Sequence, residues 1–479
     1  MHADLSRDTF DPARHFARVV MQQGRPPLDA DWNEQSAIHH HYLRRLAADL
    51  IGPHGGPRGD LGFGVTLSDT TRTLTIGPGR YYVDGVLVEN PRPLEISPST
   101  PLGRRLMERY GDLEPPFAVY LEVWERHVTA LQDPRIREVA LGGPDTATRV
   151  QVAWTVGVRP LKGMENTGDC DAVWDRLTEA ERNRAVGGLT AMAGVSGSDT
   201  LDPCLVPPDA AYRGLGNQLY RVEIHRGGRT EGPRLVQGGV HGFQQRVPGQ
   251  GTETVAIEIA LKRPTFKWSR ENGSVFFAVR SLEGQVAVVE TLGPDPRLDL
   301  SPGDWVEITD DERAAPGGTG ILVQVTDVDR DQLTVILDDR GEELPVYGDD
   351  DAGLHPLLRR WDQSQPVSVR RDGHASPSPS ELDDGAVVIE PGWIELEDGI
   401  RVRFDENAAY QPGEYWLIPA RTATGDIEWP RDGAGHPEAV PPRGMGLRRA
   451  PLALVLDKGE VGDCRRCFDG IAVPCRMIK

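Results

Sequence analysis

The amino-acid sequence predicts a mainly β protein, made of several small β-sandwich or barrel modules with an N-terminal arm plus helix and a small helical insertion. Three observations support this fold class. Glycine (54 residues) and proline (39 residues) are frequent, which is typical of short strands joined by tight turns. Hydrophobic and polar residues alternate over many short stretches, as in half-buried strands. Helical spacing of apolar residues is limited to two segments.

The first 60 residues are expected to form an arm followed by a helix. Residues 4–30 are predicted to be irregular, because proline and glycine interrupt them. The helix is predicted to begin near Asp31, since Asp31 and Glu34 have the spacing of a capping box, and to end at Gly52. Its apolar residues recur at helical spacing and require something to pack on: Trp32, Leu43, Leu46 and Leu50.

The remainder of the chain is predicted to divide into β modules and less regular segments. A short amphipathic helix is expected at 171–184, followed by a small and flexible stretch at 187–198. The predicted boundaries are 1–60 for the docking arm and helix, 61–165 for the first part of a β domain, 166–215 for the helical or flexible insertion, 216–297 for the second part of the β domain, 298–344 for a small SH3- or OB-like barrel, 345–385 for a linker, 386–460 for a C-terminal β domain and 461–479 for a cysteine-bearing tail.

Charge and motif content argue against several classes of function. The formal net charge is −20, whereas a nucleic-acid partner would require clustered lysine and arginine, so none is expected. No run of about 18 apolar residues occurs, so no membrane span is expected, and the start lacks the apolar core of a signal peptide. Walker, HExxH and GxSxG motifs are absent, so the sequence predicts a protein that is not an enzyme.

The five cysteines leave their own chemical state open. Cys464 and Cys467 form a CxxC pair and Cys475 follows, which gives three thiolates that can converge on a zinc ion. A disulfide with one free thiol, or reduced thiols alone, also explains this pattern. Cys170 and Cys204 bracket the insertion and form a second candidate disulfide pair. Zinc at the C-terminal cysteines is therefore one of three interpretations, and no other cofactor is expected.

Three further motifs favour structural explanations. Paired and tripled aspartates between residues 310 and 384 are assigned to turns and solvated loops. His39, His40 and His41 are adjacent on the predicted helix, so they cannot chelate one ion from one face. The pair Asn272-Gly273 predicts a hairpin turn after the strand that begins at residue 265, with a contact between subunits as the alternative.

Several blocks of the sequence resemble an uncharacterised-domain family of structural proteins encoded with extracellular contractile injection systems, which are phage-tail-like particles. The resemblance spans most of the chain, and each block is long enough to be specific. The blocks are SRDTF at 6–10, MQQGRPPLDADWNEQ at 21–35, YLEVWERHVTAL at 120–131, EVALGGPDTATR at 138–149, YRGLGNQLYRVEIH at 212–225, TFKWSRENGSV at 265–275, GDWVEI at 303–308 and GEYWLIPAR at 413–421.

The resemblance implies a structural particle component, either associated with the baseplate or spike or part of a cage. Its expected partners are other baseplate, spike, sheath or tube subunits, with three or six copies imposed by the symmetry of the particle. It is expected to assemble in the cytoplasm and to be released extracellularly only with the particle or by lysis. The residues expected to dock on partners are Arg7, Phe10, Phe16, Arg18, Arg25, Asp31, Trp32 and Asn33.

Three alternatives to this interpretation stay open at the level of sequence. The arm can fold back on its own chain instead of docking on a neighbour. The chain can be a receptor- or glycan-binding tail-fibre module, which requires an exposed aromatic platform, with Trp393 and Trp416 as candidates. It can also be a cargo hydrolase, which requires two carboxylates held across a cleft.

Overall fold

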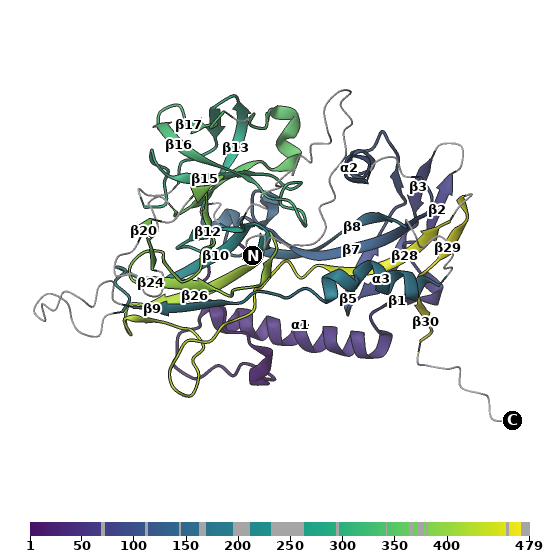
Figure 1. Ribbon diagram of the computed structural model, residues 1–479, viewed down its shortest axis with the longest axis horizontal. Coiled ribbons are helices and arrows are strands. Elements are labelled where there is room, and N and C mark those ends of the chain that lie inside the picture. The colour runs from purple at the N-terminus through teal and green to yellow at the C-terminus, as the bar shows by residue number, and fades with distance from the viewer. Residues whose placement is uncertain are drawn as a thin grey trace, which may run out of the picture. The chain divides into compact units, whose positions relative to one another are not determined.

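The computed structural model describes residues 1–68, 72–110, 114–142, 145–161, 169–194, 211–230, 263–293, 297–341, 343–363, 368–370, 378–379, 382–456 and 459–470 (Figure 1). Strands dominate these residues, which confirms the predicted mainly β class. The chain divides into two compact units. Unit 1 comprises Met1, Arg7–Arg184 and Met445–Lys479, and unit 2 comprises His2–Ser6 and Ala185–Gly444.

Unit 1 contains three sheets among its described residues. The first has the order β30 (Cys467–Phe468), β1 (His54–Pro57), β4 (Gly79–Val83), β5 (Val86–Asn90); the second has β2 (Val65–Ser68), β3 (Thr73–Ile76), β6 (Leu94–Ile96); the third has β29 (Val461–Asp463), β28 (Arg448–Val455), β7 (Phe117–Val128), β8 (Arg149–Pro160). Strands β7 and β8 pair along their whole length, and β28 pairs with the other edge of β7. Alternate residues of β7, including Val119, Leu121 and Val123, enter the core of this unit.

The three α-helices of the described residues also belong to unit 1: α1 (Asp29–Ile51), α2 (Pro101–Tyr110) and α3 (Cys170–Arg182). Helix α1 begins two residues before the predicted start, and its N-cap residue Leu28 offers no side-chain hydrogen bond, so the predicted capping box is wrong. The Glu34 carboxylate accepts a hydrogen bond from Thr9 instead. The predicted end is confirmed, because Gly52 closes the helix with a φ of 90°. Single-turn 3-10 helices lie at Pro12–Arg14, Arg58–Asp60, Pro134–Ile136 and Val139–Leu141.

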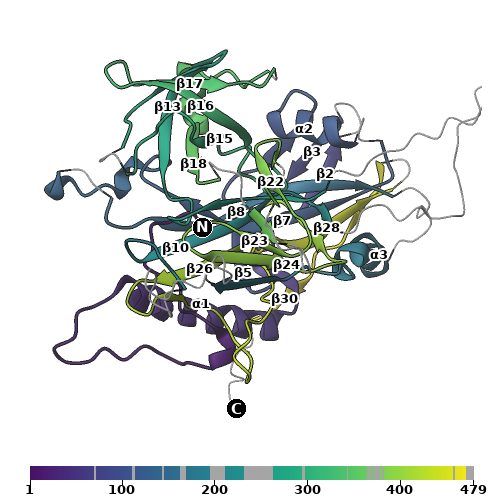
Figure 2. The ribbon, with the colours of Figure 1, turned by 60° about the vertical axis from the view of Figure 1, so that its left-hand side comes forward.

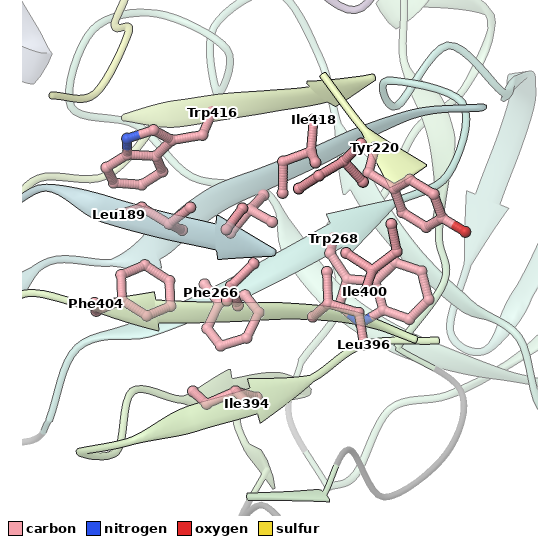
Figure 3. Packing of buried hydrophobic residues seen from close by; sticks show 14 of the residues in the cluster. Leu189, Tyr220, Phe266, Trp268, Ile394, Leu396, Ile400, Phe404, Trp416 and Ile418 are labelled. Atoms are coloured by element: carbon pink, nitrogen blue, oxygen red, sulfur yellow. The ribbon is translucent and has the colours of Figure 1, made fainter. Parts of the chain in front are cut away.

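Unit 2 contains a β-sandwich whose two sheets face each other across a large hydrophobic core. One sheet has the order β21 (Leu382–Asp383), β22 (Ala386–Val388), β12 (Thr265–Ser269), β10 (Gln218–Arg226), β26 (Tyr415–Arg421), β27 (Asp426–Ile427); the other has β20 (Ser378–Pro379), β19 (Ser368–Arg370), β23 (Trp393–Glu395), β24 (Ile400–Phe404), β9 (Leu189–Ala193). Figure 3 shows side chains of both sheets meeting in this core, among them Phe266, Phe404 and Trp416. Strands β11 (Gly228–Arg229) and β25 (Ala409–Tyr410) form a separate two-stranded sheet. In the sequence, β11 follows β10, and β25 lies between β24 and β26.

Unit 2 also contains a closed six-stranded barrel (Figure 2). Its order is β13 (Phe276–Glu283), β14 (Val286–Val289), β17 (Thr334–Asp338), β16 (Ile321–Asp329), β15 (Trp305–Thr309), β18 (Leu357–Trp361). The barrel confirms the small β barrel predicted from the sequence but extends past both of its predicted boundaries. The expected linker at 345–385 instead contains η5 (Asp349–Leu354) and the closing strand β18, because β18 pairs with β13 and β15, which are distant in sequence.

Two other expectations differ from the structure because they also depend on pairing between strands that are distant in sequence. The stretch at 187–198, expected to be flexible, contains β9, whose residues are largely buried because β9 pairs with β24. Asn272 and Gly273 both have the positive φ angles of the predicted turn, but they do not close a hairpin. The strand before them, β12, pairs with β10 and β22, whereas β13 enters the barrel. The turn therefore joins the sandwich to the barrel.

Candidate docking surface

Helix α1 presents a row of large apolar side chains to solvent. Trp32 is 79% exposed, and Leu43, Leu46 and Leu50 are 63%, 57% and 64% exposed. Tyr42, beside them, is 52% exposed. The sequence had indicated that these apolar residues need a packing partner, and within the described residues no such partner covers them. Exposed apolar area of this extent is typical of an interaction surface.

The exposed row follows the spacing of a coiled-coil seam. Trp32, Ser36, His39, Leu43, Leu46 and Leu50 are separated alternately by four and three residues, and all six are exposed. At 100° per residue they occupy a stripe about 80° wide that is roughly 27 Å long. A 3.5-residue period is the pattern by which one helix packs against another along its length. We call these six residues the α1 seam.

The opposite side of α1 is fixed to unit 1. Ala30 and Ile38 are each 1% exposed, and the Arg44 guanidinium lies 2.6 Å from the Glu125 carboxylate. The turn between β4 and β5 also approaches the helix backbone, because a Cβ added to Gly85 would lie 2.1 Å from the carbonyl oxygen of Arg44. These contacts hold the helix on the side away from the α1 seam, and none of them involves a seam residue.

The N-terminal arm runs back onto α1. The Thr9 hydroxyl donates to Glu34 at 2.6 Å, and the backbone N–H of Val19 donates to Gln35 Oε1 at 2.8 Å. The ring of Phe10 lies 5.8 Å from that of His41, measured between centroids. Residues 9–19 therefore fold back on their own chain, which is one of the alternatives left open by the sequence. Apolar side chains of the arm nevertheless stay exposed: Phe16, Val20, Met21 and Leu28.

Some of the residues predicted to dock are partly buried within the chain, and the others are exposed to solvent. Arg7, Phe10 and Asp31 are partly buried within the chain. Exposed members of the set are Phe16, Arg18, Arg25, Trp32 and Asn33. Sequence reasoning left Leu43, Leu46 and Leu50 out of the docking set, although their spacing was visible. The alternation of four- and three-residue steps was the signal that could have placed them there.

A second site, which is polar, lies inside unit 2, where charged residues interrupt otherwise apolar strands. The ammonium of Lys267, on β12, lies 2.6 Å from Glu307 on β15 and 3.2 Å from Glu223 on β10. Glu223 also pairs with Arg221 at 2.5 Å, and Trp361 donates to Glu307 at 2.9 Å. All five side chains are buried. We call them the buried ion cluster; a charged residue inside a strand pattern was its only sequence signal.

Electrostatics keep the carboxylates of this cluster ionised. Burial opposes ionisation of Glu223, but the charges of Arg221 and Lys267 outweigh it and hold its pKa well below the usual range. Burial likewise opposes ionisation of Glu307, and Lys267 again lowers its pKa below the ordinary value. The cluster is therefore a network in which each buried charge is compensated by a neighbour.

The N-terminal tip, His2–Ser6, inserts beside this cluster. His2 Nε2 lies 3.0 Å from the Glu223 carboxylate, and its ring meets Trp361 edge-on at 6.1 Å between centroids. The Ala3 carbonyl accepts a hydrogen bond from Asn272 Nδ2 at 2.8 Å, and Ala3 is 7% exposed. Sequence analysis did not single out these residues. Burial, followed by the charges of Arg359 and Arg221, holds the pKa of His2 well below its usual range.

The cysteines pair in a way that the sequence did not indicate. Cys170, at the start of α3, forms a disulfide with Cys464, and their Cα atoms are 5.5 Å apart. Cys467 is a free, exposed thiol, whereas Cys204 and Cys475 lie outside the described residues. The described part of the chain holds no group of three metal-ligating side chains. Cys464 is engaged in this disulfide and Cys475 lies outside the described residues, so zinc binding at the C-terminal cysteines stays a prediction.

The other candidate sites have structural partners. Trp416 is 2% exposed in the sandwich core, so it cannot belong to a glycan-binding platform, and Trp393 is partly covered by the guanidinium of Arg403, 4.9 Å above its ring. Several of the aspartates assigned to turns do cap turns: Asp310 accepts from the backbone N–H groups of residues 312 and 313, and Asp338 from that of residue 340.

One further group of buried carboxylates lies in unit 2. Burial, followed by the charge of Asp362, raises the pKa of Glu271 to about 7, and its Oε1 atom is buried without a hydrogen-bond partner. Arg360 pairs with Glu271 at 3.5 Å, and Arg270 pairs with Glu397 at 2.8 Å. The two arginines offset only part of the cost of burying these carboxylates, because burial still raises the pKa of both Glu271 and Glu397.

Together, the fold and the surface define a β-rich protein of two compact units that carries an exposed apolar helix seam and an anchored N-terminal tip. The chain belongs to a family described as "Family of unknown function (DUF6519)", whose model matches residues 1–180 and 162–478. No curated protein and no solved structure matches the chain. Among the helices of the described residues, none has the length and apolar character needed to cross a membrane.

Proposed function

We propose that this protein is a non-enzymatic structural subunit of a phage-tail-like contractile injection particle, associated with its baseplate or spike or forming a cage. In this proposal it assembles through the α1 seam and the N-terminal arm. The particle itself is inferred from the sequence blocks quoted above, such as those at 21–35 and 120–131. Assembly in the cytoplasm and release with the particle belong to the same proposal.

The observation that carries the assembly role is the exposure of the α1 seam. A helix in a chain that functions alone buries its apolar stripe, because full burial of a leucine side chain contributes about 1.5–3 kcal/mol. Here Leu43, Leu46 and Leu50 leave more than half of their surface in water. An unsatisfied stripe of this kind favours a protein that reaches its functional state in a complex.

The proposed partner of the seam is α1 of another copy of the chain. A seam with a 3.5-residue period fits a helix with the same period, and a second copy supplies one without requiring a different gene product. The seam carries no lysine, arginine, aspartate or glutamate, so two copies can meet along it without like-charge repulsion between such residues. The polar positions Ser36 and His39 would set the register of the pairing, as buried polar residues do in coiled coils.

The area available is consistent with a stable contact. Trp32 and Tyr42 are large aromatic residues that each bury roughly 150–250 Å² when fully enclosed, and three leucines extend the surface beyond them. This surface supplies part of the roughly 800 Å² per partner that a standard interface buries.

The test is the oligomeric state of the full chain, measured by analytical ultracentrifugation. We expect a trimer or hexamer for the natural sequence and a monomer for the Leu43→Asp/Leu46→Asp variant. Arg45→Ala is the matched control, because Arg45 is exposed on the other side of the same helix. Circular dichroism and thermal unfolding of each variant establish that it is folded. A natural chain that stays monomeric at high concentration would refute assembly through the seam.

The particle assignment is tested separately in the source organism. We expect the tagged natural chain to co-sediment with sheath and tube proteins in purified particles, and the seam variant to be lost from them. Recovery of particles that lack the natural chain, from cells that express it, would contradict the assignment to a contractile injection particle while leaving self-association to be judged by ultracentrifugation.

A further inference from the structure

The N-terminal segment is made of two parts with different contacts. Residues 2–19, which we call the strap, are held at intervals in both units. Residues 20–28, which we call the hinge, connect the strap to α1 and are exposed throughout. The hinge contains one turn, in which the N–H of Arg25 donates to the carbonyl of Gln22 and Gly24 has a φ of 74°.

The tip of the strap occupies a site with defined chemistry. The imidazole of His2 meets the Glu223 carboxylate at 3.0 Å, and the Asn272 amide donates to the backbone of Ala3. Arg421 donates to the Ser6 carbonyl at 3.0 Å, so the backbone of the tip is bound at two points. A Cβ added to Gly273 would lie 2.9 Å from the His2 ring, which shows how closely the site encloses that side chain. The tip therefore occupies its site in the way that a separate bound peptide would.

We propose that the strap exchanges between copies, so that His2–Ser6 of one chain occupies the tip site of a second copy. This inference rests on the proposed function, because assembly through the α1 seam brings the copies together. Every strap contact named above is reproduced when the strap comes from a neighbour with the same sequence. Exchange therefore changes the conformation of the hinge alone, which is the condition under which swapping costs little.

The composition of the hinge and the reach of the arm both allow exchange. The hinge, residues 20–28, can span roughly 30 Å when extended, at about 3.3 Å per residue. Pro26 and Pro27 favour an extended course over a compact turn, and none of the apolar hinge residues Val20, Met21 and Leu28 is buried in the chain. The charges of the tip site select which peptide can bind there. The site offers the Glu223 carboxylate beside Arg221 and Arg359, and this combination fits an uncharged imidazole such as that of His2.

The exchange is tested with cysteines placed in different chains. One tagged copy carries Ala3→Cys, a second copy with another tag carries Asn272→Cys, and both carry Cys467→Ser to remove the exposed natural thiol. The two are co-expressed and oxidised, and the associated fraction is analysed on a non-reducing gel. A covalent dimer that contains both tags forms only if the strap of one copy lies in the site of the other. We expect this dimer, and we expect its loss in the Leu43→Asp/Leu46→Asp background.

The controls separate failure of the exchange from failure of the docking proposal. Ala3→Cys and Asn272→Cys in one chain report whether the geometry permits the bond. An associated fraction in which this double variant closes internally, while the split pair gives no mixed dimer, would overturn the exchange alone. Absence of any association would overturn docking and the exchange with it. A second pair, Ser6→Cys and Arg421→Cys bridged by a short bismaleimide, gives the same result without altering Asn272.

Discussion

Truncation of two seam leucines gives the sharpest quantitative test of the assembly surface. Leu43 and Leu46 are 63% and 57% exposed, so burial of their remaining surface would contribute about 1–2 kcal/mol each, from the about 1.5–3 kcal/mol of a fully buried leucine. The Leu43→Ala/Leu46→Ala variant should therefore lose about 2–4 kcal/mol of association free energy per chain. This corresponds to an association constant roughly 30- to 1000-fold lower.

The stability of the separate chain should respond differently. Roughly two fifths of each side chain is already covered within the chain, so the free energy of unfolding should fall by about 1–2 kcal/mol, less than the loss in association free energy. Sedimentation equilibrium gives the association constant, and urea unfolding under dissociating conditions gives the stability. An association constant within threefold of the natural value, or an equal loss for Arg45→Ala, would refute the seam as the contact surface.

Three further predictions concern the interior of the two units. Lys267→Met should lower the stability of unit 2 by about 3–5 kcal/mol, because it leaves the carboxylates of Glu223 and Glu307 buried without their shared cation. Urea unfolding measures this change, and an unchanged unfolding midpoint would contradict the role of the buried ion cluster. Glu271, with its pKa raised to about 7, is protonated in the fold and ionised in the unfolded chain between about pH 4.5 and 7, so stability should fall by about 1–3 kcal/mol as pH rises through this window and stay level above it. Glu271→Gln should remove that component, and a variant with the same pH profile as the natural chain would argue against the shift. Cys170→Ser should lower the stability of unit 1 by about 2–5 kcal/mol under oxidising conditions and have little effect in reductant, whereas Cys467→Ser should be neutral in both.

The helix ends and the turns were accessible from the sequence because they depend on neighbouring residues. Gly52 ends α1 as predicted, since a glycine at that position adopts the positive φ of a helix terminus. Asn272 and Gly273 adopt the predicted turn angles for the same local reason. The capping box failed because Glu34 had a competing partner, Thr9, brought to it by the returning arm. The spacing of neighbouring residues cannot predict such competition, because Thr9 is distant from Glu34 in the sequence.

Partnerships between distant segments were not accessible from the sequence. Cys170 pairs with Cys464 across most of the chain, and the sequence offered only nearer candidates. Strand β18, placed in a predicted linker, closes the barrel because two strands far from it in sequence leave an edge that it fills. Single-sequence patterns describe what a segment can do, whereas pairing depends on which edges the rest of the chain presents.

By itself the sequence determined the β-rich class, the position and end of the first long helix, and the presence on that helix of an apolar face in need of a partner. Only the tertiary structure decided which side of α1 the chain itself covers. Ile38 is buried and Leu43, Leu46 and Leu50 are not. On the covered side, Arg44 contacts Glu125 and its backbone is approached by the turn at Gly85, both far along the chain. The physical reason is that amphipathic spacing gives the direction of an apolar face, while its burial depends on surfaces assembled from distant segments.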